Sequence, residues 1–266
     1  MPELRRPVIR IPRVPTRAVA VGVPAAAMAA LGFQAWYVNH RNLPSFDELD
    51  PSGTIGDPSH PRVRFTLLGD SSITAPGLDH PDDIWVRQVA RRLSSTYCID
   101  IVNHAVSGSR VRDVVERQLV DATSERGDVA IVSVGANDAL RGTSMSRLET
   151  LLTRIVTELR TCHSVVVLAG VGDLGDCPRL PFPLGAIAGE RCRAANAVHG
   201  RVASGVDGVI RAPVREVSGD AFRDPSLFSP DLFHPNAEGH AVWARAAFPA
   251  VATAVSQALR ERAAVS

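Results

Sequence analysis

The stretch Val63-Arg-Phe-Thr-Leu-Leu-Gly-Asp-Ser-Ser72 decides the fold class. Residues 63–67 are mostly apolar or β-branched, which predicts a short buried strand. Gly69 ends this run, and Asp70 and Ser71 follow at its carboxyl end, which is where open α/β sheets bind ligands. All three residues of Gly-Asp-Ser are also good turn formers, so the stretch alone leaves open both a plain turn and a site.

The chain beyond this stretch alternates between predicted strands and helices. Apolar runs predict further strands at 98–102, 129–134, 165–169 and 208–212, and helical patterns at 82–93, 111–125, 146–160, 185–204 and 236–262. Such alternation predicts an α/β fold in which a five-stranded parallel sheet carries helices on both faces. The ends of the first three strands and the loop before the last helix then meet at one edge of the sheet.

Length and charge narrow the class of protein. The chain has 266 residues, which suits one domain of about 200 residues plus an extension. Its net charge is +1 and 21% of its residues are charged, so nothing indicates a nucleic-acid partner.

The first 61 residues divide into three segments. A basic tail, residues 1–17, mixes arginines with prolines, and residues 18–38 contain no charged side chain. A helix over 18–38 would be roughly 30 Å long, the thickness of a bilayer core, and the flanking charges would place the N-terminus in the cytoplasm. An uncleaved membrane anchor, a signal peptide cleaved near Ala27-Met-Ala29 and a buried core helix are the interpretations that stay open. The first two predict a domain outside the cytoplasm, anchored or secreted, with the proline-rich segment 39–61 as a linker to a domain at 62–266.

The four cysteines fit an exported protein. Cys177 and Cys192 bracket a loop of about 15 residues, and a disulfide between them would be worth about 3 kcal/mol in the chain-entropy model. Cys98 and Cys162 each precede a predicted strand, and neither belongs to a metal-type Cys-x-x-Cys pair. The sequence therefore predicts a disulfide between Cys177 and Cys192 and no metal site.

The polar residues at the predicted sheet edge match the demands of acyl transfer. A serine nucleophile, Ser71, needs a base, and His234 lies in a polar loop three residues after Asp231, which could orient it. The developing oxyanion needs donors, which the N–H groups of Ser71 and Gly108 and the amide of Asn137 could supply.

Four ordered blocks of this sequence resemble those of the SGNH hydrolases, the GDSL-type esterases and lipases. They are Gly69-Asp-Ser71, Gly108 after Asn103-His-Ala-Val-Ser, Gly135-Ala-Asn137 and Asp231-Leu-Phe-His234, within about residues 63–255. The resemblance implies a flavodoxin-like α/β/α sandwich without cofactor, with Ser71 as nucleophile, His234 as base, Asp231 as its partner, and Ser71, Gly108 and Asn137 as the oxyanion hole. Ser72 departs from the family's namesake motif, which has leucine at that position.

The residues around these blocks predict the substrate pocket. We expect Asp70, His104 and Asp138 to border it, and Leu174 and Phe182 to form an apolar wall that suits a small or lipid-like ester. Gly170-Val-Gly-Asp-Leu-Gly175 matches a dinucleotide fingerprint, but the prolines that follow prevent a helix from starting there. The sequence therefore predicts a serine ester hydrolase; an O-acyltransferase or deacetylase of cell-envelope glycan and a non-catalytic binding module on the same fold are the alternatives.

Overall fold

The structure is a computed structural model that describes residues 16–265. It divides into two units, Met1–Arg41 and Asn42–Ser266, each of which is described by itself. The first unit contains one helix, α1 (Thr16–His40), which covers the predicted apolar segment 18–38. Within the described residues, no helix combines the length and hydropathy needed to cross a bilayer. The predicted membrane-spanning anchor is therefore not supported, because α1 is rich in alanine, whose small side chain contributes little apolar surface.

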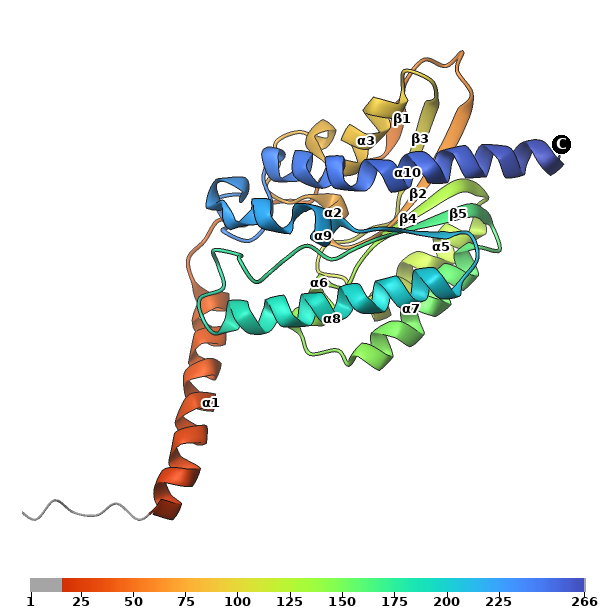
Figure 1. Cartoon of the computed structure of the whole chain (residues 1–266). Helices are drawn as coiled ribbons and strands as arrows, with labels where there is room; N and C mark the ends of the chain where they lie inside the picture. The colour runs from red at the N-terminus through yellow and green to blue at the C-terminus, as the bar shows by residue number, and fades with distance from the viewer. Residues whose placement is uncertain (1–15, 266) are drawn as a thin grey trace, which may run out of the picture. The chain divides into compact units, whose positions relative to one another are not determined.

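The second unit alternates strands and helices as predicted (Figure 1). Its strands are β1 (Gly53–Ile55), β2 (Arg62–Gly69), β3 (Cys98–Asn103), β4 (Gly127–Ser133), β5 (His163–Ala169) and β6 (Val209–Ala212). Its α-helices are α2 (Ser71–Thr74), α3 (Trp85–Leu93), α4 (Val111–Asp113), α5 (Leu119–Ser124), α6 (Ala136–Leu140), α7 (Met145–Leu159), α8 (Leu184–Gly205), α9 (Val214–Ser218) and α10 (Ala237–Val265). Short 3-10 turns are η1 (Pro81–Asp83), η3 (Gly219–Arg223) and η4 (Pro225–Leu227), and a π-helical turn, η2 (Val114–Gln118), joins α4 to α5.

The sheet has the order β1-β3-β2-β4-β5-β6. The five longer strands run parallel, as predicted, and β1 is an additional strand that pairs antiparallel with β3 at the edge. This strand lies inside the segment 39–61 that was predicted to be a linker. Three residues are too few to show a strand period, so only the pairing with β3 reveals β1.

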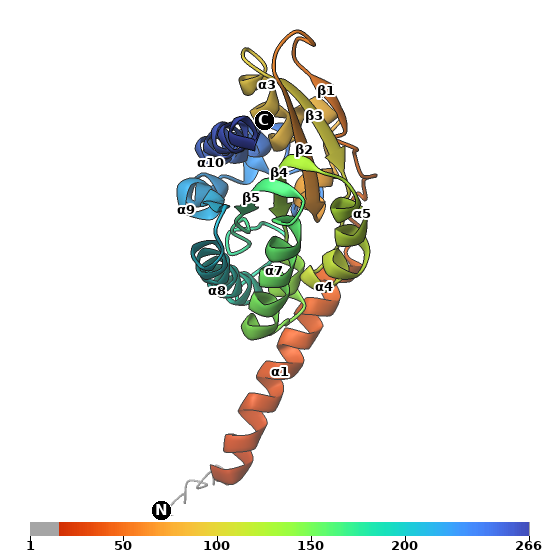
Figure 2. The ribbon, with the colours of Figure 1, turned by 90° about the vertical axis from the view of Figure 1, so that its right-hand side faces the viewer.

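Helices cover both faces of the sheet, which confirms the predicted α/β fold (Figure 2). On one face, Val63, Phe65 and Leu67 of β2 pack with the apolar sides of α3 and α10. On the other face, Leu68 joins the cluster formed by the α4 to α5 segment, α7 and α8. Because parallel strands are buried on both faces, they appear in the sequence as nearly continuous apolar runs.

Gly69 sets the close contact between β2 and β4 at the end that carries the polar residues. Its φ is +152°, and a Cβ built there would lie 1.9 Å from the carbonyl oxygen of Ser133. The next residue, Asp70, donates its backbone N–H to that same oxygen at 3.1 Å. A side chain at position 69 would therefore push the two strand ends apart.

The predicted disulfide is absent. All four cysteines lie in the described part of the chain and all four are free. Cys177 packs with Phe222, Leu227 and Phe228, whereas Cys192 belongs to the cluster between the sheet and α8. The prediction was wrong because closeness in sequence does not bring two thiols together when each is buried in a different cluster. Burial raises the pKa of Cys177 to about 12 and that of Cys192 to about 11.

Candidate active site

Ser71 is the first residue of α2, directly after the central strand β2. Asp70 caps this short helix by accepting a hydrogen bond from the backbone N–H of Ser72 at 3.0 Å. N–H groups in the first turn of a helix lack intrahelical partners, so the backbone N–H of Ser71 is available to a ligand. The half-buried side chain of Ser71 lines a pocket that His234 also lines.

His234 and Asp231 form a compact pair in the loop before α10. The Nδ1 atom of His234 lies 2.6 Å from Oδ2 of Asp231, whose side chain is 5% exposed. The other oxygen of Asp231 accepts the backbone N–H groups of Phe233 at 2.9 Å and His234 at 3.0 Å. Burial alone would raise the pKa of Asp231, but the hydrogen bonds from His234 and Phe233 outweigh it and hold the pKa below its ordinary value.

The carboxylate of Asp231 is thus ionised at neutral pH and accepts the proton on Nδ1 of His234. This fixes the tautomer in which Nε2 has a free lone pair. Such a nitrogen can take a proton from a hydroxyl group, which is what a serine nucleophile requires.

The predicted oxyanion donors follow the strands on either side of β2. Gly108 lies in the loop after β3, with a φ of +75°, and Asn137 is the second residue of α6, after β4. Because β3 and β4 both neighbour β2, the sheet order brings these loops to the same edge as Ser71. Gly135 makes the turn into α6 with a φ of +127°, and a Cβ there would lie 2.9 Å from Val171.

Gln118 ties the loop after β3 to the end of β2. Its Oε1 accepts the backbone N–H of Gly69 at 2.8 Å, and its Nε2 donates to the carbonyl oxygen of Gly69 at 2.9 Å and to the hydroxyl of Ser109 at 3.1 Å. The side chain is 3% exposed and lies in the π-helical turn η2. Gln118 could not be predicted from the sequence, because a glutamine within a helical pattern carries no signal of such a role.

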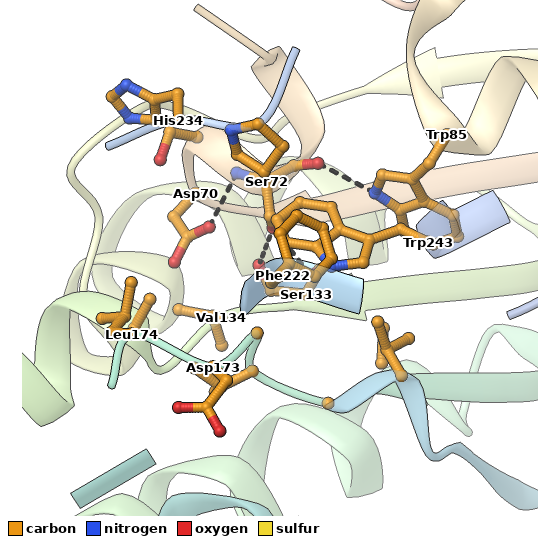
Figure 3. Close-up of a pocket in the computed structure, with 18 of the residues that line it drawn as sticks. Asp70, Ser72, Trp85, Ser133, Val134, Asp173, Leu174, Phe222, His234 and Trp243 are labelled. Carbon is orange, nitrogen blue, oxygen red and sulfur yellow. Dashed lines mark hydrogen bonds between the residues drawn. The ribbon is translucent and has the colours of Figure 1, made fainter. Parts of the chain in front are cut away.

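The pocket beside Ser71 and His234 is mostly apolar (Figure 3). Aromatic side chains, and aliphatic side chains at or after the ends of β4, β5 and β6, form most of its wall: Trp85, Phe222, Phe228, Phe233, Trp243, Val134, Ala169, Val171, Leu174 and Val214. Trp85 also donates its indole N–H to the backbone oxygen of Ser72 at 2.8 Å, and the hydroxyl of Ser72 lies 2.7 Å from that of Ser133. Leu174 is thus in the wall, as predicted, whereas none of the aromatic residues, including Phe233 between Asp231 and His234, was predicted to line the pocket.

Asp70 lies at this pocket with one oxygen unpaired. Asp70 is 2% exposed, and its Oδ2 atom has no hydrogen-bond partner among residues 16–265. Burial raises the pKa of Asp70 to about 6, although the N–H of Ser72 opposes the shift. The predicted position of Asp70 beside the pocket therefore agrees with the structure.

Three other predicted pocket residues lie elsewhere. Asp138 is fully buried and accepts the backbone N–H of Val111 at 2.9 Å, so its carboxylate holds α6 to the start of α4. Phe182 is 83% exposed and borders a separate polar hollow. His104 is half-buried and is not among the residues that line the pocket. The prediction failed for these residues because nearness to a motif in sequence does not determine the direction of a side chain.

Three further histidines, His163, His199 and His240, are buried in the fold. Burial lowers the pKa of His199 to about 4 and that of His240 to about 3, and it also lowers the pKa of His163. His240 accepts the backbone N–H of Trp85 through Nδ1, and His163 contacts the hydroxyl of Thr66. Across residues 16–265, no group of three or more His, Cys, Asp or Glu is arranged to hold a metal ion.

Comparison with known sequences identifies similar proteins. The sequence profile of the GDSL-like Lipase/Acylhydrolase family matches residues 67–242. The GDSL-like esterase Rv1075c of Mycobacterium tuberculosis is 32% identical over 209 residues, which cover 74% of this chain and 64% of that protein. Esterase TesA of Pseudomonas aeruginosa is 28% identical over 106 residues, which cover 40% of this chain and 52% of TesA. The chain thus spans between about half and two thirds of the length of these curated relatives.

Comparison with solved structures supports the same architecture. The crystal structure of TesA superposes with a TM-score of 0.59 over 72% of this chain and 99% of that chain, at 23% sequence identity. At this identity the likeness establishes the fold: a mostly parallel sheet between helices, in the arrangement of the SGNH hydrolases.

Proposed function

Since the chain belongs to the GDSL-like lipase/acylhydrolase family, we propose that it hydrolyses carboxylic esters with Ser71 as nucleophile, His234 as base and Asp231 as its partner. The observation that carries the proposal is the 2.6 Å contact between His234 Nδ1 and Asp231 Oδ2, with the ring of His234 in the wall of the pocket that Ser71 lines. The names of the two curated relatives, both called esterases, support the same class of reaction.

The proposed reaction has two halves. In the first, Nε2 of His234 takes the proton of Ser71 as its oxygen attacks the ester carbonyl, and the proton then passes to the departing alcohol. In the second, His234 takes a proton from water, which attacks the acyl-enzyme, and returns it to the oxygen of Ser71. The backbone N–H groups of Ser71 and Gly108 and the amide of Asn137 are the proposed donors to the oxyanion of both tetrahedral states.

The composition of the pocket favours esters with an apolar acyl group. Its wall is mainly aromatic and aliphatic, so a hydrocarbon chain gains free energy by leaving water there. A sugar hydroxyl in the same place would lose hydrogen bonds to water without finding enough partners. Transfer of the acyl group to a glycan hydroxyl instead of water would use the same residues and is the competing outcome of the experiment below.

The test measures hydrolysis of p-nitrophenyl butyrate by the full chain and by two variants. Ser71→Ala is expected to lose at least 1000-fold in kcat/KM, on the order of the loss of a nucleophile. Ser204→Ala serves as the matched control, because that exposed serine donates its hydroxyl to the backbone oxygen of Gly200 within α8. Equal rates for wild type and Ser71→Ala would contradict the proposal. In the same assay with a glycan acceptor added, acyl-glycan products formed in place of free acid would point to the transferase.

Export of the hydrolase domain is a separate proposal. It rests on the basic segment 1–17 followed by the uncharged segment 18–38. Residues 1–15 lie outside the described part of the chain. Protease accessibility on intact cells tests export, and N-terminal sequencing of the mature protein tests cleavage of a signal peptide.

A further inference from the structure

The catalytic pocket is small, and Asp173 borders it. Its free volume is about 70 Å³. A single water molecule needs about 10–15 Å³ of free space, so the pocket has room for a short hydrocarbon chain. Its lining includes Asp173, which Figure 3 places across the pocket from His234 and away from Trp85 and Trp243, with the carboxylate pointing away from the pocket.

A second, larger hollow lies behind Asp173. Its free volume is about 580 Å³, and charged side chains from α8, α9 and the neighbouring loops surround it: Asp173, Asp176, Arg193, Arg215, Glu216, Asp220 and Arg223. Asp173 lines both cavities, whereas Val214 lines the pocket and the next residue, Arg215, lines the hollow. The partition between the two cavities is therefore Asp173 together with the start of α9.

An ion pair closes this partition. One oxygen of Asp173 lies 2.5 Å from the guanidinium of Arg215, and the other accepts the backbone N–H of Gly175 at 2.8 Å. The two side chains are only 11% and 18% exposed. An apolar chain that displaced one partner would leave the other charge poorly solvated and unpaired, which is strongly unfavourable.

A pocket with a wall on one side suits the acyl part of the ester. In the proposed mechanism the acyl group stays bonded to Ser71 until water attacks, whereas the alcohol must leave first. A pocket that ends at a wall can hold the group that stays, and the group that leaves needs an open path to solvent.

Building on the proposed ester hydrolysis, we propose that the Asp173–Arg215 ion pair forms the end wall of the acyl pocket and limits the substrate to short acyl chains. The ion pair thus acts as a specificity determinant that the sequence motif does not contain.

The first test uses the wild-type full chain. We measure kcat/KM for p-nitrophenyl esters from acetate to dodecanoate, below their aggregation concentrations. We expect kcat/KM to rise over the shortest acyl chains and to fall at least tenfold from its maximum by the decanoate, because the longer chain meets the wall. A rate that stays level or rises out to the dodecanoate would overturn the proposal.

The second test removes the wall. In Asp173→Ala/Arg215→Ala both charges and most of both side chains are gone, and the ratio of kcat/KM for decanoate to that for butyrate is expected to rise at least tenfold. The matched control is Glu149→Ala/Arg201→Ala, which removes an exposed ion pair of 2.6 Å between α7 and α8 and should leave this ratio within twofold of wild type. Rates are expressed per active site titrated with diethyl p-nitrophenyl phosphate, so a misfolded fraction does not enter the ratio.

The outcomes separate the two proposals. An unchanged ratio in the fully titratable double variant overturns the role of the ion pair but leaves ester hydrolysis standing. The dependence of kcat/KM on alcohol length is measured with butyrate esters of increasing alcohol length. If the double variant changes this dependence, the alcohol occupies the pocket and the proposed role of the ion pair is overturned. If the double variant yields no titratable site, the wild-type chain-length profile decides alone. Failure of the Ser71→Ala experiment would instead remove the proposed function itself.

Discussion

Replacing Asp231 by asparagine is expected to lower kcat/KM about 1000-fold while the fold stays intact. The reason lies in the two backbone N–H groups of Phe233 and His234, which both point at one oxygen of Asp231. In the variant the amide oxygen must accept these N–H groups, so the amide NH₂ faces Nδ1 of His234. The imidazole then accepts at Nδ1 and carries its proton on Nε2, which is the wrong tautomer to take a proton from Ser71.

The magnitude follows from the cost of restoring the productive tautomer. Wild type has a hydrogen bond of 2.6 Å to a carboxylate, and hydrogen bonds to charged groups are worth about 1.5–3 kcal/mol. In the variant, the productive tautomer sets two N–H groups against each other, and an unsatisfied buried donor costs about 1–3 kcal/mol more. A sum of about 4 kcal/mol corresponds to about three powers of ten in rate.

The assay compares Asp231→Asn with Asp231→Ala, using p-nitrophenyl butyrate for kcat/KM and urea unfolding for stability. Alanine leaves His234 free to adopt either tautomer but removes the acceptor of two backbone N–H groups. We therefore expect Asp231→Ala to lose less activity than Asp231→Asn and more stability, by about 1–2 kcal/mol. An asparagine variant that retains more than a tenth of wild-type kcat/KM, or that is less active only because it has unfolded, would refute the reasoning.

Three further predictions concern the end of β2. Gly69→Ala should lower the free energy of unfolding in urea by about 3 kcal/mol or more, because its Cβ would lie 1.9 Å from the oxygen of Ser133. The control Gly205→Ala, at the end of α8, should change the free energy of unfolding by less than about 1 kcal/mol. The pKa of Asp70 is raised from 3.8 to about 6, so the folded state binds the extra proton between these values and stability falls as pH rises through this window. Asp70→Asn should therefore be more stable than wild type by about 3 kcal/mol in urea at pH 8, with little difference below pH 4; a difference independent of pH would contradict the assignment. Ser72→Ala should keep kcat/KM within about threefold of wild type, since the hydroxyl of Ser72 bonds to that of Ser133. A loss as large as that of Ser71→Ala would contradict the assignment of Ser71 as the nucleophile.

The fold was largely predictable because its signals are local. The strands predicted at 129–134 and 165–169 appear as Gly127–Ser133 and His163–Ala169, since continuous apolar runs are what parallel strands buried on both faces require. By contrast, the strand Gly53–Ile55 depends on pairing with residues about 46 positions away, and no period is visible in three residues. The disulfide prediction failed for a related reason, since spacing along the chain says nothing about which cluster buries each thiol.

Some residues of the candidate site were likewise predictable from the sequence and others were not. Asp231 and His234 stand three residues apart, so their contact follows from a short loop, and the motif around Ser71 follows from the strand before it. These residues could be proposed from the sequence, and their catalytic roles stay predictions until the variants are measured. Gln118, whose side chain bonds both backbone groups of Gly69, gave no signal in the sequence.

The sequence by itself thus determined the alternation of strands and helices, the edge of the sheet where polar residues gather, and the candidate nucleophile and base. Only the tertiary structure decided the size and the lining of the pocket, to which Trp243, Phe222 and Asp173 contribute from separate elements. The physical reason is the distance along the chain over which each kind of interaction acts. Hydrogen bonding and periodic burial act over a few residues and leave a pattern in the chain, whereas a cavity is shaped by side chains that become neighbours only when the whole domain packs.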